Sequence, residues 1–549
     1  MSNLELRLLS SLAKVFTRNA PSAKLDSDWL SALMGERVSL QAAYLYEGDV
    51  RSWGKITVKS PDGVQVVMRR VRYMPGYIPG NFKTDGDYIS SEDGVFPDLL
   101  EPFDANRLPL INGIWQSVWI DFHVTSDAKA GLHPIVISIE TDDGVELATV
   151  ETTIEVIPVE LPSLEIPHTK WFHVDCLANY YEVEVFSEKH WEIIENFVSY
   201  AVEHGINTIL TPIHTPPLDT EIGGERLTTQ LIDVSIRGYK YDFDFTKLER
   251  WVEMCKRVGV KYFEIAHLFT QWGAKHAPKI MGTKDSKEMQ FFGWETDATG
   301  PEYSNYLKQM LPALIGKLNE WGISENTIFH ISDEPTSENL ENYMAARKIV
   351  EEILSGFRVV DALSDYAFYE KGVVPLPIPA VSDIEPFIEA NVPELWCYFC
   401  CSQSSGVPNH FFMHPSYRNR ILGVLMYKFN IKGFLHWGYN FYNSVYSIYP
   451  VNPFHVTDAD GAFPSGDSFL VYPGSDGKPL ASLRLMVNQE AFNDYCALTL
   501  LEKLEGRELV LTLIDEILTE ELRFSNIPTN DEYLIKFRRY VNKRIGASR

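Results

Sequence analysis

The sequence has little of what marks several large classes of protein. Only six of its 549 residues are cysteines, which is too few for a disulfide framework in so long a chain. No run of eighteen apolar residues occurs, so we expect no transmembrane helix and no membrane partner. Basic residues are outnumbered by acidic ones, and the formal net charge of −26 argues against binding nucleic acid through its phosphates.

Motifs for metal or nucleotide binding are also missing. Cys397 and Cys400 form a Cys-x-x-Cys pattern, but no second pair of cysteines or histidines lies near it, so we expect packed cysteines in place of a zinc site. The histidines lack the spacing of catalytic metal sites, and we predict no metal. Neither a Walker-type loop nor a Gly-x-Ser-x-Gly motif is present, which removes the commonest NTPase and esterase hypotheses.

The first residues favour a cytoplasmic location. Glu5, Arg7 and Lys14 interrupt what would have to be the apolar core of a secretion signal, so we expect no such signal. A chain of 549 residues with 45% hydrophobic content exceeds what one core usually organises. We therefore expect two or three domains.

Residues 1–160 carry the pattern of an antiparallel β-sandwich. Stretches with period-two alternation, among them 54–58, 119–124 and 134–140, are separated by turns such as those at Gly63 and Gly144. Residues 4–18 are expected to form a short helix ahead of these strands. Prolines at positions 158, 162 and 167 then stiffen the chain and indicate a linker.

After the linker, strands alternate with amphipathic helices, which predicts βα units around a parallel sheet. The expected strands are 171–174, 208–211, 262–267, 327–331, 358–362, 395–399, 433–437 and 469–472, with helices at 189–203, 246–258, 302–321, 338–354, 384–390, 417–429 and 483–504. Eight strands suit a (β/α)8 TIM-type barrel over residues 161–480, followed by a C-terminal helical extension over 481–549. A doubly wound open sheet is the alternative, but no Gly-rich turn follows the first strand.

The strongest signal for chemistry is the adjacent pair Asp333 and Glu334, at the end of the fourth expected strand. Polar residues at the carboxyl ends of barrel strands point into the active-site mouth. The alternative is that the two acids only begin the following helix, where negative charge is favourable. Adjacent residues cannot easily flank a sugar from both faces, as glycosidases with an acid and a separate nucleophile require. They can serve a route in which a 2-acetamido group of the substrate attacks, so the pair suggests an N-acetylhexosamine substrate.

Five segments resemble glycoside hydrolase family 123, the β-N-acetylgalactosaminidases. They read KWFHVDCLA at 170–178, FHISDEP at 329–335, LWCYFCC at 395–401, GFLHWGYN at 433–440, and FLVYPG at 469–474 followed by SLRL at 482–485. The resemblance implies a β-sandwich before the barrel and a retaining, substrate-assisted mechanism without metal or organic cofactor. It also implies that Glu334 is the general acid/base and that Asp333 steers the acetamido group towards an oxazoline-like intermediate. The long connections 212–243 and 269–300 match no family pattern.

Eight further residues lie where a sugar would bind in such a barrel. Aromatic faces pack on the apolar face of a pyranose, and polar side chains at strand ends can bind its hydroxyls. The candidates for substrate binding are His173, Asp175, His214, Trp272, Tyr398, Trp437, Tyr439 and Asn440. The alternative for each is packing or hydrogen bonding within the barrel top.

The sequence thus predicts a glycosidase that removes terminal β-linked N-acetylgalactosamine from an oligosaccharide or glycoconjugate. One alternative keeps the barrel but changes the sugar, for example to β-N-acetylglucosamine. A transglycosylase would use the same residues with a sugar acceptor in place of water. A third alternative is a catalytically silent carbohydrate-binding protein, in which Asp333 only caps a helix.

Overall fold

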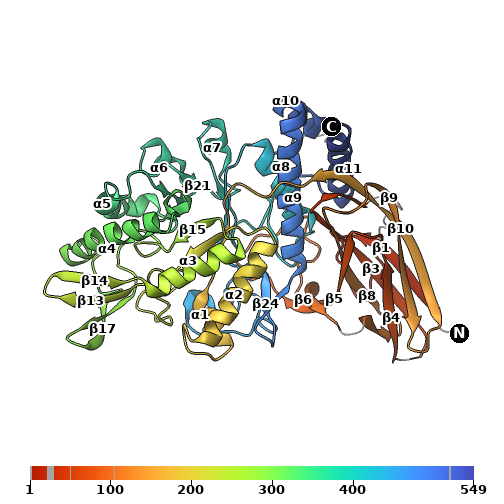
Figure 1. Cartoon of the computed structure of the whole chain (residues 1–549), viewed down its shortest axis with the longest axis horizontal. Coiled ribbons are helices and arrows are strands. Elements are labelled where there is room, and N and C mark those ends of the chain that lie inside the picture. The colour runs from red at the N-terminus through yellow and green to blue at the C-terminus, as the bar shows by residue number, and fades with distance from the viewer. Residues whose placement is uncertain (1–2, 22–29, 50, 104–105, 518–520, 549) are drawn as a thin grey trace.

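The structure is a computed structural model, and it describes residues 3–21, 30–49, 51–103, 106–517 and 521–548. The chain is multidomain: β-sheets of the N-terminal part lie at one end, and helices around a parallel sheet lie at the other (Figure 1). Among the described residues, no helix has both the length and the apolar character needed to cross a membrane.

The N-terminal part is a pair of five-stranded sheets that pack face to face. In the first sheet the strands run β1 (Asn3–Ser10), β3 (Arg37–Glu47), β8 (Trp115–Val124), β5 (Val64–Gly76) and β6 (Gly94–Pro102), each antiparallel to its neighbours. In the second they run β2 (Leu30–Met34), β10 (Glu146–Glu160), β9 (Gly131–Thr141), β4 (Arg51–Lys59) and β7 (Arg107–Ile111), antiparallel except for the parallel β2–β10 pair. The predicted N-terminal antiparallel sheet domain is confirmed.

Strand β8 shows that the first sheet is buried on both faces. Val118, Ile120 and Phe122 point into the apolar core between the two sheets. The alternate residue Trp119 belongs to the core that this sheet shares with the helices of the second part. An antiparallel sheet commonly leaves one face to solvent. Because both faces are covered here, the sandwich is fastened to the rest of the molecule by apolar packing.

The helix expected at 4–18 is wrong. Residues 3–10 form β1, which pairs with β3 along its whole length and buries Leu4 and Leu8 in the sandwich core. Leu9 and Leu12 add a helix-like spacing to the sequence, while Leu4 and Leu8 also suit the period of a strand. The pairing of residues 3–10 with β3 shows that this segment is a strand.

The second part is built on a curled parallel sheet. Its strands run β19 (Arg358–Val359), β18 (Thr327–Phe329), β15 (Tyr262–Ile265), β12 (Thr208–Thr211), β11 (His168–Lys170), β23 (Phe434–His436) and β22 (Cys397–Tyr398), and neighbours are parallel. After Val360 the chain continues as β20 (Asp361–Ala362), which pairs in parallel with β21 (Pro377–Ile378). Ala380 then makes a parallel bridge to Tyr398 of β22. Parallel pairings therefore link the two edges of the seven-stranded sheet through β20 and β21.

The barrel strand expected at 469–472 is wrong. At this place β24 (Val471–Pro473) pairs antiparallel with β25 (Pro479–Ala481), in a two-stranded sheet of its own. The run is buried in the main core, and a short buried apolar run cannot be told from a core strand by its pattern. The strand β21, which the sequence analysis missed, has two residues and begins with Pro377, so it carries no strand pattern.

Helices cover the parallel sheet and separate it from the sandwich. They are α1 (Val174–Tyr180), α2 (Glu188–Glu203), α3 (Thr246–Val258), α4 (Pro301–Glu320), α5 (Leu340–Val350), α6 (Tyr366–Glu370), α7 (Glu385–Glu389), α8 (Tyr417–Lys428), α9 (Leu483–Glu505), α10 (Arg507–Ile517) and α11 (Asp531–Ala547). All seven predicted helices are present, with ends within four residues of those expected. Helix α9 stands between the sandwich and the parallel sheet (Figure 1). It packs so closely on α8 that a Cβ on Gly423 would lie 1.7 Å from the carbonyl oxygen of Ala491.

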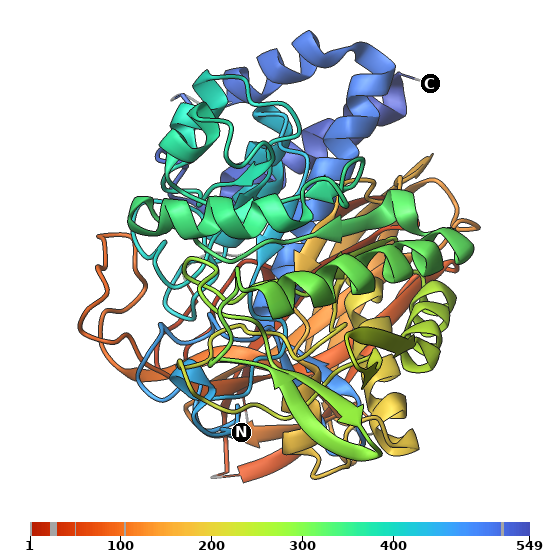
Figure 2. The same ribbon diagram turned by 90° about the vertical axis from the view of Figure 1, so that its left-hand side faces the viewer.

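The long connections after β12 and β15 fold into a second small sheet. Its strands run β14 (Lys240–Asp244), β13 (Asp233–Arg237), β16 (Ile280–Lys284) and β17 (Lys287–Phe292). This sheet lies at the end of the molecule furthest from the sandwich (Figure 1) and faces the viewer in Figure 2.

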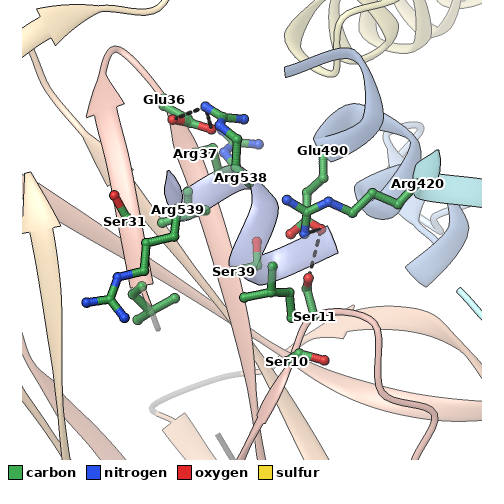
Figure 3. A pocket seen from close by; sticks show the side chains of 13 residues that line it. Ser10, Ser11, Ser31, Glu36, Arg37, Ser39, Arg420, Glu490, Arg538 and Arg539 are labelled. Carbon is green, nitrogen blue, oxygen red and sulfur yellow. Dashed lines mark hydrogen bonds and ion pairs between the residues drawn. The ribbon is translucent and has the colours of Figure 1, made fainter. Parts of the chain in front are cut away.

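A buried network of alternating charges joins the sandwich to three helices. Arg538 of α11 pairs with Glu36 of the sandwich at 2.7 Å (Figure 3). It also pairs with Asp494 of α9 at 2.9 Å. Arg420 of α8 pairs with Asp494 and with Glu490 of α9, each at 2.9 Å. Every one of these charges is buried, so removing one partner would leave another charge uncompensated.

Candidate active site

A pocket opens where the parallel strands end at their carboxyl ends. It is lined by Trp171, Leu218, Asp219, Gln271, Trp272, Asp333, Glu334, Ala362, Tyr398, Cys400, Cys401, Leu435, Trp437 and Phe463. These residues come from segments that follow or end six of the parallel strands, β11, β12, β15, β18, β22 and β23, and from β20. Apolar and aromatic walls with a few convergent polar groups are the usual lining of a small-molecule site.

The adjacent acids Asp333 and Glu334 both lie in this pocket. Glu334 has a φ of 44°, in the left-handed region that non-glycine residues seldom occupy, and such strain is concentrated at functional sites. Burial raises the pKa of Asp333 well above its usual range, and the neighbouring charges of Glu334 and Asp219 raise it further. Burial also raises the pKa of Glu334. The two carboxyls therefore titrate as a pair that readily holds a proton.

Tyr398 forms a hydrogen bond with Glu334. Its hydroxyl donates a hydrogen bond of 2.6 Å to Oε1 of Glu334. This bond favours the charged carboxylate, so it lowers the pKa of Glu334 against the effect of burial. A carboxyl with these opposing influences is suited to exchange a proton in both directions.

Asp361 fixes the peptide that leads into the acid pair. Its Oδ1 accepts hydrogen bonds from the backbone N–H groups of Ile331 and Ser332, at 2.9 and 3.3 Å. Its Oδ2 accepts a hydrogen bond from the hydroxyl of Tyr343. Strand β18 ends at Phe329, so hydrogen bonds to Asp361 fix the backbone beyond the end of the strand.

A buried histidine, His330, lies three residues before Asp333. His330 Nε2 is 2.7 Å from Oε1 of Glu264, and its Nδ1 is 3.6 Å from Oδ1 of Asp361. Although burial opposes it, pairing with these two carboxylates raises the pKa of His330 to about 9. Glu264 also accepts a hydrogen bond of 2.9 Å from the indole of Trp171. Glu264 thus links His330 to Trp171, a ring that lines the pocket, through buried hydrogen bonds.

Trp437 forms another wall of the pocket and is anchored from behind. Its indole Nε1 donates a hydrogen bond of 2.9 Å to Oδ2 of Asp467. Asp467 is buried, and burial raises its pKa to about 7. The anchored indole presents a fixed apolar face to the pocket.

Trp272 is the most exposed of the predicted aromatic residues. It lines the pocket, its side chain is 40% exposed, and its backbone N–H donates a hydrogen bond of 2.8 Å to the carbonyl of Asp333. The structure thus places five of the predicted site residues in one pocket, namely Asp333, Glu334, Tyr398, Trp437 and Trp272.

The other five predicted substrate-binding residues lie outside the pocket lining and are buried. Asn440 accepts a hydrogen bond from the backbone N–H of His173 and donates one to its carbonyl, at 2.9 and 3.0 Å. Asp175 forms a buried ion pair of 2.7 Å with Arg226. Tyr439 donates a hydrogen bond to the carbonyl of Phe197. His214 is also enclosed, at 1% exposure. These side chains make contacts within the protein, outside the lining of the pocket.

Several pocket residues escaped the sequence analysis. Asp219 and Gln271 come from the long connections, and burial raises the pKa of Asp219 to about 6. Cys400 and Cys401 line the pocket, although the sequence predicted only packed cysteines. For the cysteines, their place directly after the strand of Tyr398 was the available signal. Asp219 had no such signal, since no strand precedes it closely.

The described residues contain one group of side chains that could hold a metal ion, namely His410, His436 and Asp467, whose ligand atoms lie within 4.8 Å of one another. All three are buried, and they lie outside the pocket lining. Burial, together with the nearby Lys170, lowers the pKa of His436 well below its usual value. Among the residues that the structure describes, Asp333 and Glu334 do not belong to this group.

Comparison with known proteins agrees with this geometry. The model of the glycoside hydrolase 123 catalytic domain matches residues 171–501. The fold is similar to that of a family 123 glycoside hydrolase from Clostridium perfringens, with a TM-score of 0.72 at 15% identity, covering 99% of this chain and 97% of that one. A β-glucuronidase from Bacteroides uniformis aligns with a TM-score of 0.30 at 11% identity, over 89% of this chain and 52% of its own, which is too poor to bear on fold or function. No curated protein sequence matches the chain.

The family model covers more than half of the chain and includes the whole pocket. The protein is accordingly a glycosidase. It belongs to glycoside hydrolase family 123.

Proposed function

We propose that this glycosidase removes a terminal β-linked N-acetylgalactosamine by a retaining, substrate-assisted mechanism. The observation that carries the proposal is the placement of two adjacent acids, Asp333 and Glu334, in one pocket where both pKa values are raised. Neighbours in sequence cannot stand on opposite faces of a sugar, so neither is placed to be a separate enzymic nucleophile. The attacking atom then comes from the substrate.

Each side chain has a defined part in this mechanism. Glu334 in its protonated form donates its proton to the glycosidic oxygen as the bond to the anomeric carbon breaks. The acetamido carbonyl oxygen attacks that carbon from the opposite face, and Asp333 accepts a hydrogen bond from the acetamido N–H. This gives an oxazolinium-like ring. Glu334, now a carboxylate, removes a proton from water, which opens the ring and restores the original configuration.

The walls of the pocket support a sugar as the ligand. Trp437 and Trp171 are both fixed through their indole N–H groups, by Asp467 and Glu264 respectively. Fixed aromatic faces bind the C–H face of a pyranose without loss of side-chain freedom. The Clostridium perfringens relative is described in terms of glycolipid glycan hydrolysis, and a glycoconjugate glycan is the substrate class proposed here.

We further propose that the parallel strands close into an eight-stranded barrel within residues 161–480. The pairing of β20 with β21, and the bridge from Ala380 to Tyr398, support closure. A barrel would place the acid pair, Tyr398 and Trp437 around one mouth, as the pocket requires.

Two measurements test the proposed function. The nitrophenyl glycoside of N-acetylgalactosamine should be hydrolysed fastest and that of N-acetylglucosamine more slowly. The galactoside should not be hydrolysed, because galactose has no acetamido group to attack the anomeric carbon. A thiazoline analogue of N-acetylgalactosamine should inhibit tightly, since it mimics the cyclised intermediate. Comparable hydrolysis of the galactoside, together with failure of the thiazoline to inhibit, would disprove the mechanism.

A further inference from the structure

Two exposed aromatic side chains lie together at the rim of the pocket. Trp272 and Tyr446 meet edge to face, with ring centroids 5.9 Å apart and ring planes at 83°. Their side chains are 40% and 42% exposed. Trp272 lines the pocket, whereas Tyr446 lies beyond it in the connection that follows β23. Large exposed aromatic side chains that lie together beside a pocket are typical of binding surfaces.

The backbone at both rings is strained. Trp272 has a φ of 58°, and Tyr446 and Ser447 have φ values of 56° and 55°. Bulky residues seldom adopt this left-handed conformation, because their Cβ atoms crowd the following carbonyl. Strain of this kind persists where surrounding contacts enforce it, and it is concentrated at functional sites.

Asp219 makes hydrogen bonds to the strained residues Tyr446 and Ser447 and to the residue before Trp272. Its Oδ2 accepts a hydrogen bond of 3.0 Å from the backbone N–H of Tyr446, and its carbonyl accepts one of 2.7 Å from the hydroxyl of Ser447. Its own N–H donates a hydrogen bond of 2.6 Å to Oε1 of Gln271, the residue before Trp272. Asp219 thus ties the loop of Trp272 to the loop of Tyr446, and its own φ is 37°.

Trp272 is also tied to the acid pair. Its N–H donates to the carbonyl of Asp333 at 2.8 Å, and its carbonyl accepts a hydrogen bond of 3.1 Å from the side chain of Asn339. The aromatic pair is therefore held at a fixed position relative to Glu334, the group proposed to protonate the departing oxygen.

We propose that Trp272 and Tyr446 form a subsite for the leaving group, namely the pyranose ring to which the terminal amino sugar is attached. This inference rests on the proposed function. The terminal sugar occupies the pocket between Trp171 and Trp437, so the next ring must emerge on the solvent side of Glu334. There it meets the exposed ring of Trp272, with Tyr446 extending the surface outwards. Aromatic faces of this kind bind the apolar face of a pyranose.

The test compares two substrates that share the terminal sugar. One is the β-fluoride of N-acetylgalactosamine, whose leaving group is too small to reach the subsite. The other is a disaccharide that ends in β-linked N-acetylgalactosamine. The ratio of their kcat/KM values, disaccharide over fluoride, should fall about tenfold in Tyr446→Ala and in Trp272→Ala, since an aromatic contact is worth up to about that factor. Trp272→Phe should recover part of the ratio.

Tyr239→Ala is the matched control, because Tyr239 is an 89% exposed aromatic residue on the β13–β14 turn and is absent from the pocket lining. It should leave the ratio unchanged. A ratio that stays within twofold of the wild-type value in both Tyr446→Ala and Trp272→Ala overturns the inference while leaving the proposed function intact. If the unaltered enzyme hydrolyses neither substrate, the proposed function falls, and this inference falls with it.

Discussion

The hydroxyl of Tyr398 donates a hydrogen bond of 2.6 Å to Oε1 of Glu334. Tyr398 ends β22, and Glu334 follows β18, so the contact spans the mouth of the pocket between two separate strands. It restrains the side chain of the proposed acid and stabilises its charged form. The proton affinity of Glu334 therefore depends on a residue 64 positions away in the chain.

Replacing Tyr398 with Phe should shift the pH dependence of hydrolysis. The hydrogen bond from Tyr398 lowers the pKa of Glu334, so its loss raises that pKa. The limb of the kcat/KM profile that reports loss of the protonated acid should then move to higher pH. The measurement is kcat/KM against pH for a nitrophenyl glycoside. Tyr239→Phe, on an exposed turn, should leave the profile in place, and a shift of the limb to lower pH would contradict the assignment.

Glu334→Gln should reduce hydrolysis by at least about 100-fold, because an amide of the same size cannot donate the proton. Asp333→Asn should cause a loss of similar order. The ionised forms of both acids are disfavoured by burial, so neither substitution should lower the midpoint of thermal unfolding at pH 8.

Glu338→Gln is the matched control for the acid pair. Glu338 lies four residues beyond Glu334 and is exposed, so its substitution should change neither activity nor stability. Full activity in Glu334→Gln would favour the hypothesis that the two acids only begin a helix.

Asp361→Ala should lower both stability and activity. It would leave two buried N–H groups and the Tyr343 hydroxyl without their acceptor, and His330 without one of its charged partners. We expect a loss of about 3 kcal/mol in the free energy of unfolding. Hydrolysis should fall as well, because the peptide that leads to Asp333 is no longer fixed.

Asp361→Asn keeps an acceptor oxygen and should lose less on both counts. Asp365→Ala provides the comparison for stability alone, since Asp365 caps α6 by accepting a hydrogen bond from Ala367 N–H. Loss of this cap should cost about 1 kcal/mol and leave kcat unchanged. If Asp361→Ala and Asp365→Ala affect kcat equally, Asp361 does not position the acid pair.

The network in Figure 3 should make stability depend on pH through Glu490. Burial raises the pKa of this carboxyl to about 7. A carboxyl whose pKa is raised in the folded state contributes stability that is complete below its unfolded pKa and is lost as the pH rises through the folded value. Glu490→Gln removes this dependence, so its stability relative to the wild type should increase by about 2–3 kcal/mol between pH 5 and pH 8.

Denaturant unfolding at pH 5 and pH 8 measures this difference. Glu508→Gln, an exposed substitution on α10, should give a difference that is the same at both pH values. A relative stability of Glu490→Gln that decreases with pH would show that Arg420 outweighs burial.

The sequence predicted those parts of the fold whose local pattern matches the final environment. Helix α3 was predicted at its observed bounds, since its apolar face repeats with a helical period and Gly259 ends it in the left-handed conformation. The strand before Asp333 was recognised for the same reason, because it is buried and followed by polar residues. In contrast, β21 has only two residues, and its existence depends on the strands beside it.

Of the residues that line the pocket, the sequence analysis predicted four at or shortly after strand ends, and it missed Asp219 and Gln271 of the long connections. Tyr398 ends β22, Trp437 follows β23 directly, and Asp333 and Glu334 lie within five residues of the end of β18. Asp219 reaches the pocket through contacts with Gln271 and Tyr446, from three separate connections, and no local pattern encodes such contacts. His173 and Asn440 also follow strands, but they satisfy each other, which spacing alone does not reveal.

The ion pair of Glu36 with Arg538 joins groups 502 positions apart. At a synthesis rate of about 5–20 residues per second, Glu36 leaves the ribosome roughly 25–100 s before its partner exists. For most of that interval helix α9 does not yet exist, so residues of the first sheet that share its core, such as Trp119, lack this helix to pack against. Incomplete chains therefore expose apolar surface while they are being made. We expect slower growth or abundant chaperone to improve the yield of folded enzyme more than substitutions that stabilise the finished fold.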